Sequence, residues 1–278
     1  SSVQGSPAAI QELQESTVHS FQRPDADHVE EDPTRTSLNG NAGSIAISKI
    51  GGSKVRFNSN FGYKSPGFDI NDVGFLRRAD LRTMGNWLQR RYDTPSKYLR
   101  SFRYNLNQWG SWNYGGDRLE MGGNVNAHWV FANNWSTGMG FNLNARNFDD
   151  RATRGGGPGA YYNPNWNYWS YQNTDDRKPV TVSNFLNVGG DHLGTHWAGV
   201  SPSVTFRPTS FLSLSQGIDW NHNVQDSQWV ENTADGRYVF GRLDQTTVSL
   251  TTRVNYTITP NLTVQIYAAP FVSAGDYT

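Results

Sequence analysis

The chain of 278 residues contains no cysteine, and its formal net charge is zero. Without cysteine there is no disulfide, no thiolate metal ligand and no thiol redox centre. A neutral chain also lacks the broad basic surface that a nucleic-acid-binding domain requires. Only 17% of the residues are charged, against about 25% in ordinary soluble domains. These shortages exclude thiol chemistry and argue against a nucleic-acid partner.

Long apolar runs are also missing. The sequence holds no run of about 18 apolar residues, so it predicts no transmembrane helix. The mean hydropathy is -0.67, although the chain contains 10 Trp, 13 Tyr and 14 Phe. Its polarity comes largely from Asn, Ser, Thr and Gln. Many rings among neutral polar residues suit sheets with one apolar and one wet face, including a barrel that crosses a membrane.

Apolar and polar residues alternate over long segments. Between residues 119 and 131, for example, Val125 and Ala127 alternate with Asn124 and Asn126. A helix would scatter these residues at period 3.6, so the alternation predicts strands with two different environments. The same pattern occurs in residues 102–114, 135–146, 212–220, 247–258 and 262–268.

Two kinds of connection separate these segments. Short turns include Ile50-Gly51-Gly52-Ser53 and Ala132-Asn133-Asn134, and longer loops cover residues 64–79, 149–159 and 230–236. The two kinds alternate, as periplasmic turns and external loops do in outer-membrane barrels. The count gives about 12 strands, many of about 12 or more residues, whereas about 9 to 11 tilted residues cross a bilayer.

Aromatic residues lie beside several of the short turns. Trp129, Phe131 and Trp135 flank one turn, and Phe206 and Phe211 flank another. Such rings favour the headgroup level of a membrane, although aromatic residues are common in strands of every kind.

We therefore predict an all-β fold, an antiparallel up-and-down transmembrane β-barrel of about 12 strands that forms part of a larger barrel. Residues 1–42 form an irregular N-terminal segment with a strand and loop, or a short helix at 8–14. Residues 43–278 form the meandering barrel segment. Ser1-Ser2-Val3-Gln4-Gly5 has neither the basic start nor the apolar core of a signal peptide. We expect a mature or internal part of a longer polypeptide.

One segment interrupts the alternation. Residues 65–80 read Ser-Pro-Gly-Phe-Asp-Ile-Asn-Asp-Val-Gly-Phe-Leu-Arg-Arg-Ala-Asp. Proline lacks the donor that a strand needs and glycine favours a turn. We predict a structured loop held by ion pairs among its charged residues, with a binding or gating loop as the alternative. The residues concerned are Asp69, Asp72, Arg77, Arg78 and Asp80.

This loop resembles the signature of an uncharacterised bacterial outer-membrane β-barrel family. Longer members carry an N-terminal carbohydrate-binding-like domain of family nine ahead of the barrel. Three other segments are similar to the same family: Phe-Gln-Arg-Pro-Asp-Ala-Asp at 21–27, Thr-Arg-Gly-Gly-Gly-Pro at 153–158 and Pro-Phe-Val-Ser-Ala-Gly at 270–275. The resemblance covers nearly the whole chain, all within the barrel part. It implies the bacterial outer membrane and supplies no mechanism.

Catalytic patterns are weak. His192 and His196 lie four residues apart, but Gly194 and the strand context remove the helical face that makes such spacing a metal signal. The glycine-rich residues 153–159 lack the lysine and hydroxyl residue of a phosphate-binding loop. We expect no enzyme activity, no metal and no cofactor.

Two groups of residues are candidates for binding. The polar strand faces predict lumen-facing side chains, and the aromatic residues between 161 and 171, interleaved with asparagines, suit stacking on a sugar. These rings are also compatible with contact to lipid headgroups or neighbouring loops. The lumen candidates are Arg103, Glu120, Asn124, Asn126, His128, Asn142, Asn144 and Arg146, and the sugar candidates are Tyr161, Tyr162, Trp166 and Trp169.

Three functional hypotheses follow. The first is an outer-membrane transporter, channel or surface receptor that works through its polar lumen and external loops. The second is a soluble β-rich carbohydrate-binding module or enzyme, and the third is a structural surface or assembly protein without a ligand. The expected partners are outer-membrane lipid and other parts of the same longer chain or partner subunits. A saccharide or another small molecule is the candidate ligand, and no nucleic acid is expected.

Overall fold

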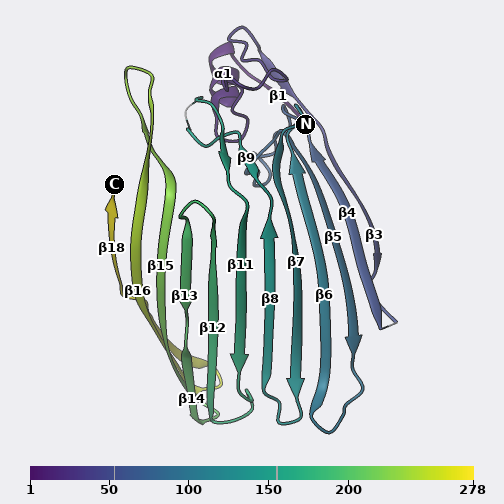
Figure 1. Ribbon diagram of the computed structural model, residues 1–278, viewed down its shortest axis with the longest axis vertical. Coiled ribbons are helices and arrows are strands. Elements are labelled where there is room, and N and C mark those ends of the chain that lie inside the picture. Colours follow the sequence, from purple (N-terminus) through teal and green to yellow (C-terminus); the bar gives the residue numbers. More distant parts are fainter. Residues whose placement is uncertain (53, 155) are drawn as a thin grey trace.

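The computed structural model describes residues 1–52, 54–154 and 156–278, and nearly all of them belong to antiparallel strands or their connections (Figure 1). The predicted all-β antiparallel fold is therefore confirmed. Ser53, in the predicted turn 50–53, and Gly155, in the predicted loop 149–159, lie outside the described residues.

The main sheet contains fourteen strands in the described part of the chain, and sequence neighbours pair with one another across it. The strands are β3 (Ala42–Lys49), β4 (Val55–Lys64), β5 (Leu81–Tyr92), β6 (Leu99–Trp112), β7 (Arg118–Phe131), β8 (Ser136–Asn144), β11 (Asn165–Asn173), β12 (Val180–Asp191), β13 (His196–Val200), β14 (Ser203–Thr209), β15 (Leu212–Asn232), β16 (Tyr238–Thr259), β17 (Leu262–Ala268) and β18 (Phe271–Tyr277).

Two of these strands continue others. β14 follows β13 along β12 and β15, and β18 lies beside β16 together with β17. The interruptions fall at Pro202 and Pro270, because proline cannot donate a hydrogen bond to the ladder. With each interrupted pair counted once, the fourteen strands form twelve ribbons, in agreement with the predicted number.

Successive connections lie at opposite ends of the sheet, and the two longest share one end (Figure 1). Short turns join β7 to β8 and β14 to β15 at one end. At the other end lie residues 65–80 and 145–164, here called the end loops. The second end loop carries a hairpin of β9 (Asn147–Asp149) and β10 (Ala160–Tyr162). The predicted longer loops at 64–79 and 149–159 share one end, as expected, but the predicted longer loop at 230–236 is wrong. β15 extends to Asn232, and only residues 233–237 join it to β16.

Residues 1–39 form a cap over the end loops (Figure 1). The cap contains β1 (Ser2–Gln4), α1 (Pro7–Glu15) and β2 (Ser37–Asn39), and β1 pairs with β2. The side chain of Ser6 accepts a hydrogen bond from the Ala9 amide at 3.3 Å, and Pro7 occupies the first helical position. Both features start helices, so the helical alternative for residues 8–14 is the observed one.

The two faces of the sheet differ in polarity and exposure. In a soluble sheet the apolar face is buried, whereas here the apolar face is exposed. We name the face that carries Val125 the outer face and the face that carries Asn124 the inner face. The large apolar residues of one outer row are 44% to 59% exposed, whereas Asn124 is 8% exposed. This outer row consists of Leu88, Leu106, Val125 and Phe141.

Buried apolar residues lie mostly at the capped end rather than in the sheet. Ile10 and Leu38 from the cap, and Leu76 and Ala79 from the first end loop, are at most 3% exposed. The described part of the molecule thus has a small conventional core at one end of a sheet whose strands expose most of their apolar side chains.

The sheet does not close in the described part of the chain. β3 pairs only with β4, while β17 and β18 pair only with β16. The structure is therefore an open antiparallel sheet with two free edges, and the predicted closed barrel is not formed by these residues alone.

Candidate functional site: the inner face and the capped end

Asparagine side chains form a continuous hydrogen-bonded ladder across the inner face. Asn107 Nδ2 donates to Asn124 Oδ1 at 3.0 Å, Asn124 donates to Asn142, and Asn142 Nδ2 donates to Asn167 Oδ1 at 2.8 Å. Asn167 donates in turn to Asn187. Because each amide has both donors and acceptors, the three middle residues, Asn124, Asn142 and Asn167, each give and receive a bond. The ladder joins β6, β7, β8, β11 and β12 through side chains alone.

Glycines on the inner face lie beneath aromatic rings of the neighbouring strand. A Cβ atom built on Gly140 would lie 2.5 Å from Trp169 Cε2, and one on Gly122 would lie 2.7 Å from Trp109 Cζ2. The Tyr171 ring covers Gly138 in the same way. Any side chain at these glycines would displace the rings, so the glycines allow the rings to lie flat along the sheet.

The structure places almost all predicted lumen residues on the inner face. Register puts Arg103, Glu120, Asn126, His128 and Asn144 on the face that carries the asparagine ladder. Arg146 is the exception, because it follows the end of β8 and its guanidinium lies 4.2 Å from the centre of the Tyr161 ring. It therefore belongs to the second end loop.

The four predicted sugar-stacking residues do not form one platform. Tyr161 and Tyr162 lie in the β9–β10 hairpin, where the Tyr161 ring contacts Phe148 with 4.8 Å between centroids. Trp166 lies on the outer face, and its ring stacks on Phe141 at 6.0 Å. Trp169 lies on the inner face. Adjacency in sequence suggested a cluster, but alternation along β11 sends its two tryptophans to opposite sides.

Buried ion pairs connect the cap to both end loops. Arg23 Nη2 lies 2.7 Å from Asp80 Oδ2, and Arg23 Nη1 also binds Asp150. Arg78 Nη2 lies 2.6 Å from Asp150 Oδ2, and His28 Nε2 lies 2.9 Å from Asp80 Oδ2. Arg23, Asp80 and Asp150 are at most 5% exposed. One arginine from the cap thus bridges two aspartates that lie 70 residues apart in the sequence.

Hydrogen bonding keeps Asp80 ionised despite its burial. Burial alone would raise its pKa, but Arg23, His28 and the Tyr114 amide all donate to the carboxylate, and together they lower the pKa below the usual range. Asp80 also has a φ of 55°, a left-handed conformation that aspartate tolerates better than most residues.

Two further contacts hold the cap in place. His19 Nε2 lies 3.0 Å from Asp69 Oδ2, and Arg151 donates to the carbonyl oxygens of Thr17 and Val18. Burial, with Arg78 nearby, lowers the pKa of Arg151 to about 10. The guanidinium remains charged at neutral pH.

The ion pairs of residues 65–80 differ from those predicted. Asp69, Arg78 and Asp80 find their partners in the cap and in the second end loop rather than in their own loop. Asp72 is exposed, and Arg77 lies 5.9 Å from the Phe75 ring centre. Nearby opposite charges suggested local pairing, but a chain segment cannot reveal partners that approach from remote residues.

Three of the four segments that carry the family resemblance meet at this junction. Arg23 belongs to residues 21–27, Asp80 to residues 65–80, and Thr153 begins residues 153–158. Gln22 packs against Gly156, and Asp25 accepts a hydrogen bond from the Gly159 amide at 2.7 Å. The fourth segment, residues 270–275, lies at the sheet edge in and beside β18.

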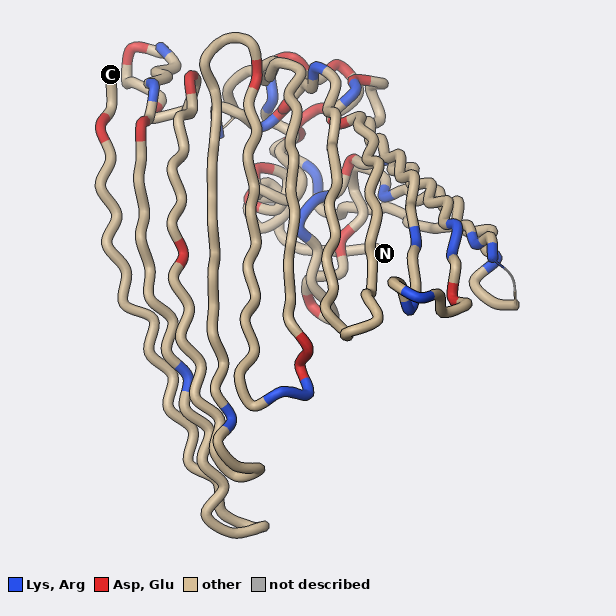
Figure 2. Tube along the Cα trace, turned by 60° about the horizontal axis from the view of Figure 1, so that its bottom comes forward, with Lys and Arg blue, Asp and Glu red and all other residues tan. Residues whose placement is uncertain are grey.

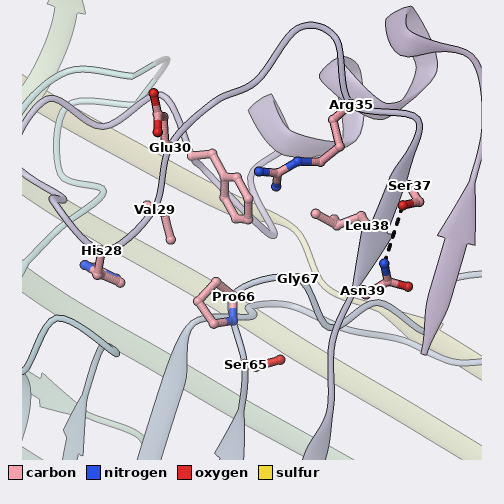
Figure 3. A pocket seen from close by; sticks show the side chains of 11 residues that line it. His28, Val29, Glu30, Arg35, Ser37, Leu38, Asn39, Ser65, Pro66 and Gly67 are labelled. Atoms are coloured by element: carbon pink, nitrogen blue, oxygen red, sulfur yellow. Dashed lines mark hydrogen bonds between the residues drawn. The ribbon is translucent and has the colours of Figure 1, made fainter.

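A cavity of about 500 Å³ lies between the cap and the first end loop (Figure 3). Arg35, Leu38 and Glu30 line it from the cap, and Pro66 lines it from the end loop. His28, also in its wall, already binds Asp80. The cavity mixes apolar and charged groups without the spacing of a nucleophile and base.

No group of three potential His, Cys, Asp or Glu metal ligands is gathered in the described ranges. Within the same residues, no helix has both the length and the apolar character needed to cross a membrane.

Comparison with known proteins gives one match. The model of a family described as a domain of unknown function, DUF5916, matches residues 7–278. No curated protein and no solved structure matches the chain. The match supports the predicted membership of an uncharacterised family.

Proposed function

We propose that this chain, which belongs to the DUF5916 family, is a segment of a bacterial outer-membrane β-barrel. The barrel acts as a transporter, channel or surface receptor through its polar inner face and its capped end loops. The observation that carries the proposal is the inverted burial of the sheet, with large apolar residues exposed on the outer face and amides buried or partly buried on the inner face.

Water is a poor solvent for such an outer face. Full burial of a Val, Leu or Phe side chain is worth about 1.5 to 3 kcal/mol, and soluble monomers rarely expose apolar patches beyond a few hundred Å². The outer face exposes such side chains on strand after strand, including Ile47, Phe61, Val125, Leu143, Val204 and Ile266. Hydrocarbon would cover this surface without a second protein layer.

The apolar band crosses the strands obliquely. The register row through Val125 passes Phe57 on β4 and reaches His222 on β15. On β15 the exposed apolar residues Leu214 and Ile218 lie nearer the short turns than His222 does. A band of constant height crosses register rows when strands tilt, as they do in barrels.

The free edges favour closure by additional strands. β3 and the β17–β18 ribbon each leave one side unpaired in the described sheet. Within hydrocarbon an unpaired edge costs several kcal/mol per polar group, so we expect other parts of a longer polypeptide or a partner subunit to complete the wall.

The positions of charged residues along the strands support the membrane assignment. Acidic and basic residues concentrate in the cap, the end loops and the turns, while long stretches of strand carry none (Figure 2). Aromatic rings border the short-turn end of the outer face, where Phe102 and Trp129 lie 5.3 Å apart between centroids. Rings at this level suit a membrane interface.

A soluble carbohydrate-binding module is the weaker alternative, because a soluble β-sandwich packs its apolar face against a second sheet. A structural surface protein without a ligand would share the barrel. The structured inner face favours a binding or transport role over this third possibility.

Single cysteines test the membrane assignment, since the chain has no cysteine of its own. We would place one at Val125, Phe141, Asn124 or Asn142 in the full-length protein in liposomes. A lipid-soluble maleimide should label the first two positions, and a small water-soluble maleimide should label the last two. Equal labelling of Val125→Cys and Asn124→Cys by the water-soluble reagent would refute the proposal.

A further inference from the structure

Five residues lie in one register row on the inner face, from β5 to β11. In order they are Arg91, Arg103, His128, Gly138 and Tyr171. The Tyr171 ring extends across Gly138, and its hydroxyl lies 2.9 Å from His128 Nδ1. The row therefore brings two guanidinium groups, an imidazole and a phenol to one strip of the inner face.

Tyr171 and Trp169 place two nearly parallel rings next to each other on the inner face, here called the aromatic platform. Their ring planes differ by 7°, and the centroids lie 6.4 Å apart on the same strand. Gly138 and Gly140 provide the space in which the two rings lie. Parallel rings that are spread along a strand offer their faces to a flat ligand, and the apolar C–H face of a sugar ring is such a partner.

Amides border this platform. Asn126 accepts from the His128 ring at 3.0 Å, and Asn142 and Asn167 lie in the adjoining ladder. Hydroxyl groups donate and accept hydrogen bonds as amides do. Sugar hydroxyls can therefore bond to the amide donors and acceptors that the ladder does not use. The combination of ring faces and neutral amides suits a saccharide better than an apolar ligand.

The other end of the row carries unbalanced positive charge. Arg91 and Arg103 are directly opposite each other, an arrangement that costs stability between like charges. Arg91 Nη2 binds Asp93 at 3.0 Å. Arg103 is exposed and has no ion-pair partner within residues 1–52, 54–154 and 156–278. An anionic ligand would relieve this repulsion.

A cavity of about 70 Å³ lies at this end, and its polar lining includes Arg91, Asp93, Arg103, His128 and Tyr171. The Asp93 carboxylate is paired with Arg91, which leaves Arg103 as the cation for a ligand. A water molecule occupies about 30 Å³ of the liquid, so the cavity has the size of a small polar group and not of a sugar ring. A guanidinium group can bind a carboxylate through two parallel hydrogen bonds.

We propose that this row binds an acidic saccharide, with a sugar ring on Trp169 and Tyr171 and a uronic-acid carboxylate at Arg103. The inference rests on the proposed barrel function, since it needs the inner face to line a water-filled lumen. It names the ligand class that the lumen admits.

Titration calorimetry on the full-length protein in detergent micelles tests the site. The probes are hexamers of galacturonate and of mannuronate, each with its uncharged methyl ester. We expect an acid hexamer to bind about tenfold or more tighter than its ester, because hydrogen bonds to an ionised group are stronger than those to a neutral ester. Arg103→Gln should abolish this preference, and Trp169→Ala should weaken both probes by about tenfold.

Matched controls lie on the outer face, one on the strand of Trp169 and one on the strand beside that of Arg103. Trp166→Ala on β11 and Arg90→Gln on β5 remove the same residue types and should leave binding unchanged. Folding of each variant is checked by circular dichroism and by gel mobility before and after heating.

The outcomes separate the two proposals. A folded wild type that remains in solution without detergent refutes the membrane assignment. A detergent-solubilised wild type that binds neither acid, or that binds acid and ester equally, overturns the acidic-saccharide site alone. Equal losses in the inner-face and outer-face variants would also overturn it.

Discussion

The capped end and the sheet of this molecule are built on opposite rules. At the capped end, Ile10 and Leu76 are buried and ionised groups such as Arg23 and Asp150 are buried with partners. In the sheet, Val125 and Phe141 are exposed, whereas Asn124 is buried and the other asparagines of the ladder are partly buried. Under the proposed barrel function the two regions face different solvents, with water around the capped end and hydrocarbon against the outer face of the sheet.

The comparison also separates two ways of satisfying polar groups. The sheet uses uncharged amides that bond to neighbours on adjacent strands, whereas the cap uses ion pairs between remote segments. Buried ion pairs cost desolvation and are sensitive to loss of one partner. Neutral hydrogen bonds are individually weaker, and the loss of one partner costs less, about 1 to 3 kcal/mol. Four predictions test this contrast, from the largest expected effect to the smallest.

Asp150→Ala should give the largest loss. It leaves Arg23 and Arg78 without their shared carboxylate, and breaking a buried pair costs about 3 to 5 kcal/mol. The cap should become sensitive to protease while the sheet persists, which limited proteolysis with mass spectrometry would show. The control is Asp235→Ala, which removes an exposed pair with Arg237 and should cost at most about 1 kcal/mol. Equal protection of both variants would contradict the structural role of Asp150.

Phe141→Arg should have the next largest effect. A cation on the lipid face costs about 2 to 4 kcal/mol at the bilayer midplane, whereas Asn142→Arg places the same charge on the inner face. The measurement is the unfolding free energy in a detergent or liposome refolding assay. Similar losses for the two neighbouring substitutions would count against the membrane assignment of the outer face.

Asn142→Ala should cost less. It removes the rung between Asn124 and Asn167, and unsatisfied buried partners cost about 1 to 3 kcal/mol. Asn60→Ala, at an exposed amide near the sheet edge, should change the unfolding free energy by at most about 0.5 kcal/mol. Urea titration of both variants measures their unfolding free energies. A larger loss of unfolding free energy in Asn60→Ala would contradict the importance of the ladder.

The smallest expected effect near neutral pH is the change in stability of the cap with pH. The pKa of Asp80 is lowered in the folded protein, so its ionisation stabilises the cap above the unfolded value of about 3.9. This contribution disappears as pH falls through the folded pKa. Protease resistance of the cap should stay constant from about pH 7 to pH 5 and decline only below about pH 4. Asp80→Asn should remove the Asp80 part of that decline, and an unchanged profile would contradict this role.

The number of strands, the alternation of their side chains and the positions of most turns could be predicted from the sequence. Each of these depends on neighbours within about a dozen residues. The inner-face positions of Asn124 and Asn142 follow from the same alternation. The platform of Trp169 over Gly140 could not be predicted, since it depends on which residues of two strands are opposite each other. Register is a property of the pair and is not encoded in either strand alone.

The capped end shows the same limit more strongly. The sequence indicated that Asp80 and Arg78 are structurally important, but it predicted that they form ion pairs within their own loop. Their actual partners include Arg23 and Asp150, at separations of 57 and 72 residues. A charged residue in a structured loop indicates that it has a partner, but only the fold determines which remote segment supplies that partner.

The separation of these partners has a kinetic consequence. Each hairpin of the sheet joins sequence neighbours and can form early, whereas Arg23 contacts Asp150 across 127 residues. Long-range contacts form slowly because loop closure must come first. We expect the N-terminal residues to dock only after the ribbons up to β8 have assembled. Protection of Arg23 would therefore report assembly of this half of the sheet, and protection before β5 to β8 are formed would contradict that order.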